Sequence, residues 1–317
     1  MISGKNILIT GGAGFIGSNL AKRLSASNKI IVVDNLSEGH EENLAGLKNI
    51  EFVKEDIRNE EFIFKLFEQK KFDYVFHLAA SFANQKSIEF PTQDLEINGF
   101  ATLKLLEAAQ KNGLKRFVYA SSSCVYGQVG EPMREEMKPA PETPYAITKL
   151  LGEYYTNFFF NYYKLPTAIV RYFNVYGPNE YPGKYRNVIP NFFAKALASQ
   201  PLPVMGDGSD SRDFTFVDDA VEGTILAAEK QTAIGQTFNI GSGVETRIIE
   251  LAKLVNKIAG NKKGIQFVPK RGWDKVTRRV ADVSKAKKLL DFQAKTSLEA
   301  GLRKTFNWLK TIPKNKL

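Results

Sequence analysis

The first 120 residues alternate short apolar runs with stretches that favour amphipathic helices. The apolar runs are rich in β-branched residues and are expected to be strands; they lie at residues 6–10, 30–34, 50–54, 74–78 and 116–121. The helical stretches between them are residues 15–24, 60–69 and 95–111. Because this rhythm is typical of strand–helix–strand crossovers, it predicts an α/β fold with a doubly wound parallel sheet covered by helices on both faces.

The pattern changes near Gly177 and Pro178. Before this point we expect one more helix, over residues 145–163, and one more strand, over residues 167–173. After a turn-rich loop at residues 179–185, helices are expected at 188–199, 218–229 and 246–259, with short strands near residues 214 and 238. We therefore expect a first domain over residues 1–177, with strand contributions from about 212–242. Residues 178–317 would form mainly a smaller, interleaved α/β lobe.

A glycine-rich turn links the first expected strand to the first expected helix. Gly11, Gly14 and Gly17 are spaced so that the backbone can approach a pyrophosphate at the positive end of the helix. Asp34, at the end of the second strand, can accept hydrogen bonds from an adenosine ribose and would repel a 2′-phosphate. Each feature alone also fits an ordinary turn. Together they predict a Rossmann-type domain that binds NAD in preference to NADP.

A tyrosine and a lysine four residues apart supply the candidate chemistry. Tyr145 and Lys149 fall on one face of the expected helix, so the ammonium is expected to lower the pKa of the phenol and make it a usable general acid/base. The spacing alone is no evidence, since such pairs occur by chance. However, Ser122 follows the preceding strand, at the carboxyl edge where open α/β sheets place ligands. A serine-rich turn with no catalytic role is the alternative.

Composition narrows the class of protein further. Of the 317 residues, 43% are hydrophobic and 25% are charged, and no run of 18 apolar residues occurs, so a membrane protein is not expected. One cysteine, two histidines and no recognisable secretion signal favour a cytoplasmic protein without disulfides or a His/Cys zinc site. The net charge of +10 fits a solvated surface, a field around a diphosphate ligand, or nucleic acid. No nucleic-acid-binding module is recognised, so that partner is not expected.

Taken together, these motifs resemble the extended short-chain dehydrogenase/reductases, in the NAD-dependent nucleotide-sugar epimerase/dehydratase branch that includes UDP-glucose 4-epimerase-like proteins. The resemblance covers essentially the whole chain. It implies catalytic roles for Ser122, Tyr145 and Lys149. It implies cofactor contacts from the glycine loop, the strand ends and the catalytic helix: Gly11, Gly14, Phe15, Ile16, Gly17, Asp34, Asn35, Asp56, Ile57, Leu78, Ala79, Ala80, Asn98, Tyr145, Lys149 and Tyr172. It implies substrate contacts from Ser122, Ser123, Tyr145, Asn174, Asn187, Val188, Arg212, Arg271 and Asp274.

Departures from the family's sequence patterns reduce the number of reactions that the resemblance implies. The 4,6-dehydratases of this branch place Asp-Glu directly after the catalytic serine or threonine, and the UDP-sugar decarboxylases keep a glutamate there, whereas this chain has Ser123 and Cys124. The resemblance therefore favours a UDP-sugar 4-epimerase acting on glucose/galactose, N-acetylhexosamine or uronate derivatives. A nucleotide-sugar 4-ketoreductase, another family activity and a non-catalytic NAD-sensing regulator remain alternatives. Cys124 is a catalytic thiol or a small buried filler.

Two further features of the sequence each have two interpretations. Arg278 matches the place where family 4-epimerases limit the size of the sugar's substituent, so it either meets an acidic group such as a uronate or faces solvent. The aromatic run at residues 154–163 fits a core helix. It would also suit a helix-on-helix seam, and the resemblance implies a homodimer.

Overall fold

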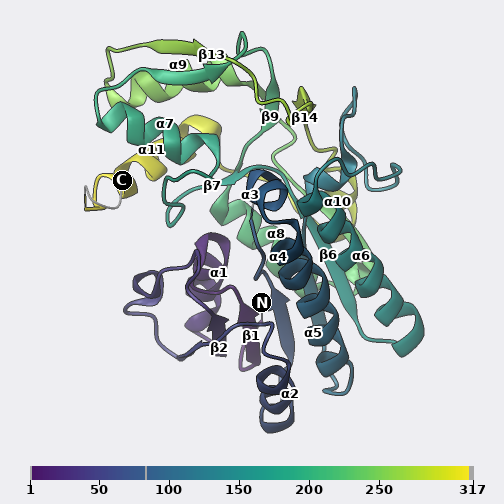
Figure 1. Ribbon diagram of the computed structural model, residues 1–317. Coiled ribbons are helices and arrows are strands. Elements are labelled where there is room, and N and C mark those ends of the chain that lie inside the picture. The colour runs from purple at the N-terminus through teal and green to yellow at the C-terminus, as the bar shows by residue number, and fades with distance from the viewer. Residues whose placement is uncertain (1, 83, 314–317) are drawn as a thin grey trace.

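The computed structural model describes residues 2–82 and 84–313, and a seven-stranded parallel sheet lies at its centre (Figure 1). The strand order is β11-β6-β5-β4-β1-β2-β3. The strands are β1 Asn6–Thr10, β2 Lys29–Asp34, β3 Ile50–Lys54, β4 Tyr74–His77, β5 Arg116–Ser122, β6 Thr167–Tyr172 and β11 Gln236–Ile240. The expected doubly wound sheet is thus confirmed. Because the chain order reverses between β1 and β4, the carboxyl edge opens a crevice there, the usual ligand site of such sheets.

Helices cover both faces of this sheet, and alternate residues along each strand pack against opposite layers. In β1, Ile7 and Ile9 belong to one hydrophobic cluster and Leu8 to the other. The first cluster includes α1 (Phe15–Ser25) and α8 (Val217–Glu229). The second includes α2 (Glu60–Gln69), α5 (Ala101–Gln110) and α6 (Pro144–Tyr163). Two-sided burial explains why the strands read as continuous apolar runs.

The helix expected over residues 95–111 is present and contains a π turn. The chain forms α3 (Asn84–Glu89), α4 (Pro91–Leu95), a π turn η2 (Glu96–Phe100) and then α5. The π turn contains the buried Asn98, whose side chain is hydrogen-bonded to the main chain of Ser81 through both amide atoms. A wider turn is a common departure from α geometry near functional sites.

The smaller lobe lies beyond the carboxyl edge of the sheet (Figure 1). Its strands are β8 Leu202–Met205 with β13 Ile265–Val268, and β9 Ser211–Asp213 between β12 Glu245–Arg247 and β14 Arg278–Arg279. Its helices are α7 Val188–Leu197, α9 Ile248–Ala259 and α11 Leu298–Leu309. The remaining elements are η1 Glu41–Leu44, η3 Ser123–Tyr126, β7 Val175–Tyr176, β10 Thr215–Phe216, η4 Gln231–Ala233 and α10 Ser284–Leu290.

Within the part of the chain that the structure describes, no helix has both the length and the apolar character that a membrane crossing needs.

Candidate active site

A cavity of about 820 Å³ follows the carboxyl edge of the sheet and extends to the smaller lobe. Every cofactor- and substrate-contacting residue expected from the sequence lines it, with the exception of Asn98. Asn98 lies behind the wall, where it fixes the loop that begins with Leu78, Ala79 and Ala80. The structure therefore brings the site residues expected from the sequence together along one cavity.

The glycine loop is shaped by close backbone approaches. Gly11 has a φ of +70°, and a Cβ there would come within 2.6 Å of the Ala79 backbone nitrogen. A Cβ on Gly17 would collide with the main chain of Gly11 and Gly12. The N-terminal residue of α1, preceded by Gly14, has no side-chain cap, so the positive end of the helix remains available to an anion.

Two carboxylates that line the cavity have different electrostatic settings. Asp34 accepts hydrogen bonds from the main-chain N–H groups of Ala13 (3.0 Å) and Leu36 (2.8 Å), while burial raises its pKa. Asp56 accepts from Asn35 at 2.9 Å and is paired with Arg58, which lowers the Asp56 pKa to about 2. Asp56 is therefore ionised and fixed in orientation. The supporting role of Arg58 was not anticipated from the sequence.

The candidate catalytic pair comes from the first two turns of α6. Thr143 caps this helix by accepting a hydrogen bond from Ala146 N–H, and Pro144 occupies its first turn. Tyr145 and Lys149 both line the cavity, and the lysine Nζ lies 6.0 Å from the centre of the tyrosine ring. Lys149 Nζ donates a hydrogen bond to the Ala120 carbonyl at 2.8 Å.

The expected lowering of the Tyr145 pKa by the lysine is not found in this structure. Burial raises the pKa of the phenol, while a hydrogen bond with Ser122 acts in the opposite direction. Burial also lowers the pKa of Lys149 to about 8, although the carboxylates of Asp94 and Glu153 favour its charged form. The Lys149 ammonium donates its hydrogen bond to the main chain, and burial is the largest influence on the pKa of the phenol.

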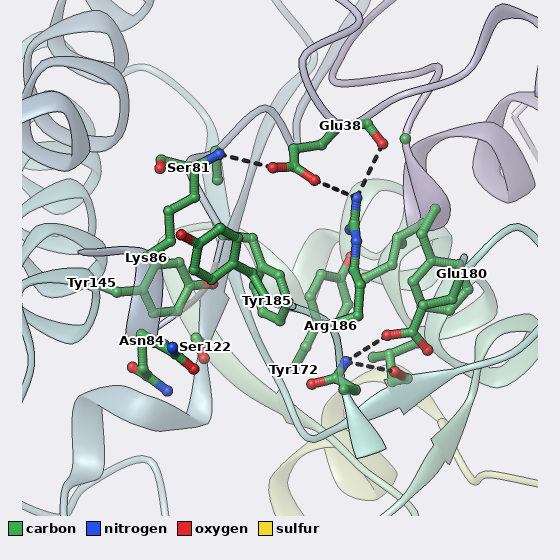
Figure 2. A pocket seen from close by; sticks show the side chains of 18 of the residues that line it. Glu38, Ser81, Asn84, Lys86, Ser122, Tyr145, Tyr172, Glu180, Tyr185 and Arg186 are labelled. Carbon is green, nitrogen blue, oxygen red and sulfur yellow. Dashed lines mark hydrogen bonds and ion pairs between the residues drawn. The ribbon is translucent and has the colours of Figure 1, made fainter. Parts of the chain in front are cut away.

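Ser122, Asn84 and Tyr145 lie together at one end of the cavity (Figure 2). Ser122 Oγ accepts a hydrogen bond from Cys124 N–H at 3.2 Å, which fixes the start of η3. Asn84 donates to the Cys124 sulfur at 3.4 Å and accepts from the Thr143 hydroxyl at 2.7 Å. Cys124 lines the cavity and is not fully buried, so a simple filler role does not describe it.

The smaller lobe supplies the guanidinium groups. Arg212, Arg271 and Asp274 line the cavity, and Arg212 lies 3.7 Å from the Asp274 carboxylate. Arg212 also donates to the main-chain oxygens of Ser211, Thr277 and Val276. These bonds hold it in place at the cavity wall.

Two asparagines on this side are held by internal hydrogen bonds. Asn174 donates to the Asp213 carbonyl at 3.0 Å, and Asn187 donates to Glu180 Oε1 at 2.7 Å. Glu180 is 2% exposed, and burial raises its pKa to about 8. No sequence pattern points to this carboxyl, because it lies in a loop that only its turn-forming residues indicate.

Arg278 does not line the cavity. Its guanidinium binds the Glu245 carboxylate, with an Nη2–Oε2 distance of 2.8 Å, and donates to the Gly130 carbonyl at 2.8 Å. The neighbouring Arg279 lines the cavity instead. Neighbouring residues of a strand point to opposite faces. The position expected for Arg278 is therefore taken by Arg279, one residue further along the chain.

Comparison with known proteins bears on what this site does. A model of the NAD dependent epimerase/dehydratase family matches residues 7–241. The UDP-glucose 4-epimerase of Mycolicibacterium smegmatis is 37% identical over 309 residues, which is 96% of this chain and 98% of that protein.

Solved structures agree in fold over almost the full length. An epimerase of the methanogen Methanothermobacter thermautotrophicus is 47% identical with a TM-score of 0.92, covering 98% of this chain and 93% of that one. UDP-glucuronic acid 4-epimerase from Bacillus cereus, solved with UDP-glucuronic acid and NAD, is 32% identical with a TM-score of 0.89, covering 96% and 99%.

Proposed function

Because this chain belongs to the NAD-dependent epimerase/dehydratase family, we propose that it interconverts UDP-linked sugars that differ in configuration at C4. The observation that carries the proposal is the placement of Tyr145, Ser122 and Lys149 in the same cavity as the glycine loop. The named relatives include UDP-glucose and UDP-glucuronate 4-epimerases, which supports a UDP-sugar as substrate.

The cofactor is NAD, and the residues present fit it. The close approach of Gly11 to Ala79 leaves no room for a side chain, and the uncapped N-terminus of α1 suits a pyrophosphate. The Asp34 carboxylate stands at the end of β2, where an adenosine ribose is recognised. When bound, NAD supplies an acceptor and donor of hydride for a sugar carbon.

The chain's own residues would handle the proton. Tyr145 would remove the proton of the sugar's 4-hydroxyl while Ser122 hydrogen-bonds the same oxygen, so that the C4–H bond can lose hydride and leave a 4-keto sugar. Lys149, whose Nζ lies 6.0 Å from the centre of the Tyr145 ring, would favour the ionised phenol against the burial that raises its pKa, and would hold the ribose on the cofactor's reactive side. Return of hydride to the opposite face of the keto sugar, with the proton given back by Tyr145, would complete the inversion.

The loop after Ser122 supports simple redox chemistry at one carbon. Ser123 and Cys124 stand where a dehydratase needs an acid and a base, and Ser123 is 2% exposed. Elimination of water would therefore lack its carboxylates. The guanidinium groups of Arg212 and Arg271 would engage the diphosphate, because their forked donors match two oxygens at once.

The test is interconversion of UDP-glucose and UDP-galactose without added NAD, repeated with UDP-N-acetylhexosamines and UDP-uronates. We expect turnover of at least one pair, with NAD retained by the purified protein. Failure with all pairs, together with stoichiometric consumption of NADH or NADPH on a 4-keto sugar, would assign the chain to the 4-ketoreductases instead.

We also infer that the enzyme is a homodimer formed through α6 and its neighbours. Tyr154, Phe158 and Tyr162 on α6 are 60%, 48% and 69% exposed, and Phe100 at the end of η2 is 60% exposed. Aromatic groups at this spacing form one apolar stripe, which a second copy would cover. Sedimentation of the wild type and of Phe158→Glu should give a dimer and a monomer; a monomeric wild type would contradict the inference.

A further inference from the structure

The two arginines of β14 point in opposite directions. β14 pairs with β9, with Arg278 opposite Ser211 and Arg279 opposite Arg212. The Arg278 guanidinium donates hydrogen bonds to the Glu245 carboxylate and the Gly130 carbonyl. Arg279 faces the cavity, and its Nε is buried without a hydrogen-bond partner among the described residues.

The neighbours of Arg279 place it at the sugar end of the cavity. Its positive charge acts on Tyr145, where it favours a lower pKa against the dominant effect of burial. Arg279 also lines a small adjoining recess of about 20 Å³ together with Asn84 and Cys124. Asn84 lies next to Tyr145 and Ser122 in Figure 2, so Arg279 lies near the groups that the proposed reaction places around the sugar's C4.

Arg279 differs from Arg212 in its hydrogen bonds. Arg212 donates to three main-chain oxygens and lies near Asp274, whereas the side chain of Arg279 makes no hydrogen bond or ion pair with any described residue. The two guanidinium groups repel each other, because the charge of Arg279 contributes, after burial, to lowering the pKa of Arg212. A buried donor without a partner is unfavourable, and the repulsion between the two guanidinium groups is offset only on the Arg212 side, by Asp274. Both are relieved by an anion at Arg279.

We propose that Arg279 binds a carboxylate carried by the sugar ring, so that the enzyme selects acidic nucleotide sugars such as uronates. This inference rests on the proposed function, since it assigns the substrate class of the same site. Arg212 and Arg271 would hold the diphosphate, which leaves Arg279 for a second anionic group. A planar guanidinium suits a carboxylate because two parallel hydrogen bonds can form.

The kinetic test compares UDP-glucuronate with UDP-glucose in the wild type and in Arg279→Gln, with Arg278→Gln as the matched control. Loss of a charge-assisted hydrogen bond should reduce kcat/KM for UDP-glucuronate about 10- to 100-fold. The value for UDP-glucose should change less than about threefold, and Arg278→Gln should spare both substrates. An equal loss for both substrates would show that Arg279 serves the diphosphate, and no loss would show that it is idle; either result overturns the proposal.

A binding measurement separates this proposal from the proposed function. Calorimetry on NAD-loaded Tyr145→Phe, with and without Arg279→Gln, would compare UDP-glucuronate, UDP-glucose and UDP in the absence of turnover. We expect UDP-glucuronate to bind more tightly than UDP-glucose only when Arg279 is present. Equal affinities would overturn the carboxylate assignment even if epimerisation occurs, and a selective effect would support it even if epimerisation fails.

Discussion

The Glu38 carboxylate accepts a hydrogen bond from Arg186 Nη2 at 2.6 Å and so joins two loops 148 residues apart in the chain. Lys86 of α3 binds the same carboxylate at 2.8 Å, and the three side chains span one side of the cavity in Figure 2. Glu38 follows β2 on the cofactor side, whereas Arg186 precedes α7 of the smaller lobe. This cluster therefore links the two lobes across the site.

Loss of the link should accelerate release of the cofactor. In Glu38→Gln two half-buried ion pairs disappear, each of the order of 1 kcal/mol at most, so NAD release should become about three- to tenfold faster. The rate can be followed by dilution of NAD-loaded protein into an NAD-trapping assay. Glu41→Gln, which changes an exposed glutamate of η1, is the control and should release NAD at the wild-type rate. Equal rates in both variants would show that the cluster does not retain the cofactor.

Asp94 should set the alkaline limit of activity. Its fully buried carboxylate accepts hydrogen bonds from Thr148 (2.5 Å) and Asn98 (2.9 Å), and its charge raises the Lys149 pKa against the larger effect of burial. Since Lys149 must stay protonated to act, kcat of the wild type should fall as the pH rises through about 8.

In Asp94→Asn this fall in kcat should occur at a lower pH. Without the negative charge of Asp94, Lys149 loses its proton at a lower pH. Activity should therefore fall severalfold more at pH 8.5 than at pH 6.5. Thr148→Val removes a hydrogen bond to Asp94 but keeps its charge, so the pH at which kcat falls should not change. A pH profile of kcat that is lowered uniformly in Asp94→Asn would indicate a purely structural role.

The buried charge of Lys149 should lower the free energy of unfolding, although catalysis needs this residue. Its pKa falls from 10.5 to about 8 on folding, so below pH 8 the folded state carries a buried charge that the unfolded state solvates. The penalty is about 3 kcal/mol at pH 7 from the shift alone. NAD-free Lys149→Met should thus be inactive yet more stable to urea at pH 7. The wild type regains stability as the pH rises from 8 towards 10.5, so the difference in stability between Lys149→Met and the wild type should shrink over this range. A Lys149→Met variant that is less stable than the wild type at pH 7 would contradict the prediction.

Glu180 should make the folded protein less stable as the pH rises from 4.5 to about 8. Its pKa rises from 4.5 to about 8 on folding, so the unfolded state releases its proton first and stability falls as the pH rises through this window. Glu180→Gln should raise the free energy of unfolding by about 3 kcal/mol at pH 7 and by much less at pH 5. Urea titrations at both values measure the difference, with the exposed Glu68→Gln as a control that should show no pH-dependent gain. A gain independent of pH would rule out the buried charge as its cause.

The sequence predicted the parts of the molecule that depend on local periodicity. The bounds of α2 agree with the expectation at both ends, because its apolar spacing and the capping Asn59 act within one helix. The glycine loop was likewise readable, since the spacing of Gly11 and Gly17 reflects a backbone constraint that no other residue meets.

Features that depend on tertiary contacts were not predictable in the same way. The π turn around Asn98 arises where its side chain meets the Ser81 backbone, far away in sequence. The two-residue strand β14 has no alternation to read, so the sequence could not tell which arginine faces the cavity. The pKa of Tyr145 depends on burial, which a four-residue spacing does not report.

In the proposed reaction, hydride leaves and returns to C4 of the sugar while Tyr145 moves only the hydroxyl proton. The most direct measurement follows deuterium placed at C4 of a UDP-sugar that the enzyme turns over, by mass spectrometry and NMR of the epimer. We predict full retention of deuterium at C4 in the product, no uptake of solvent hydrogen on carbon, and loss of turnover in Tyr145→Phe. Exchange of the C4 label with water, or undiminished turnover without the phenol, would contradict the account.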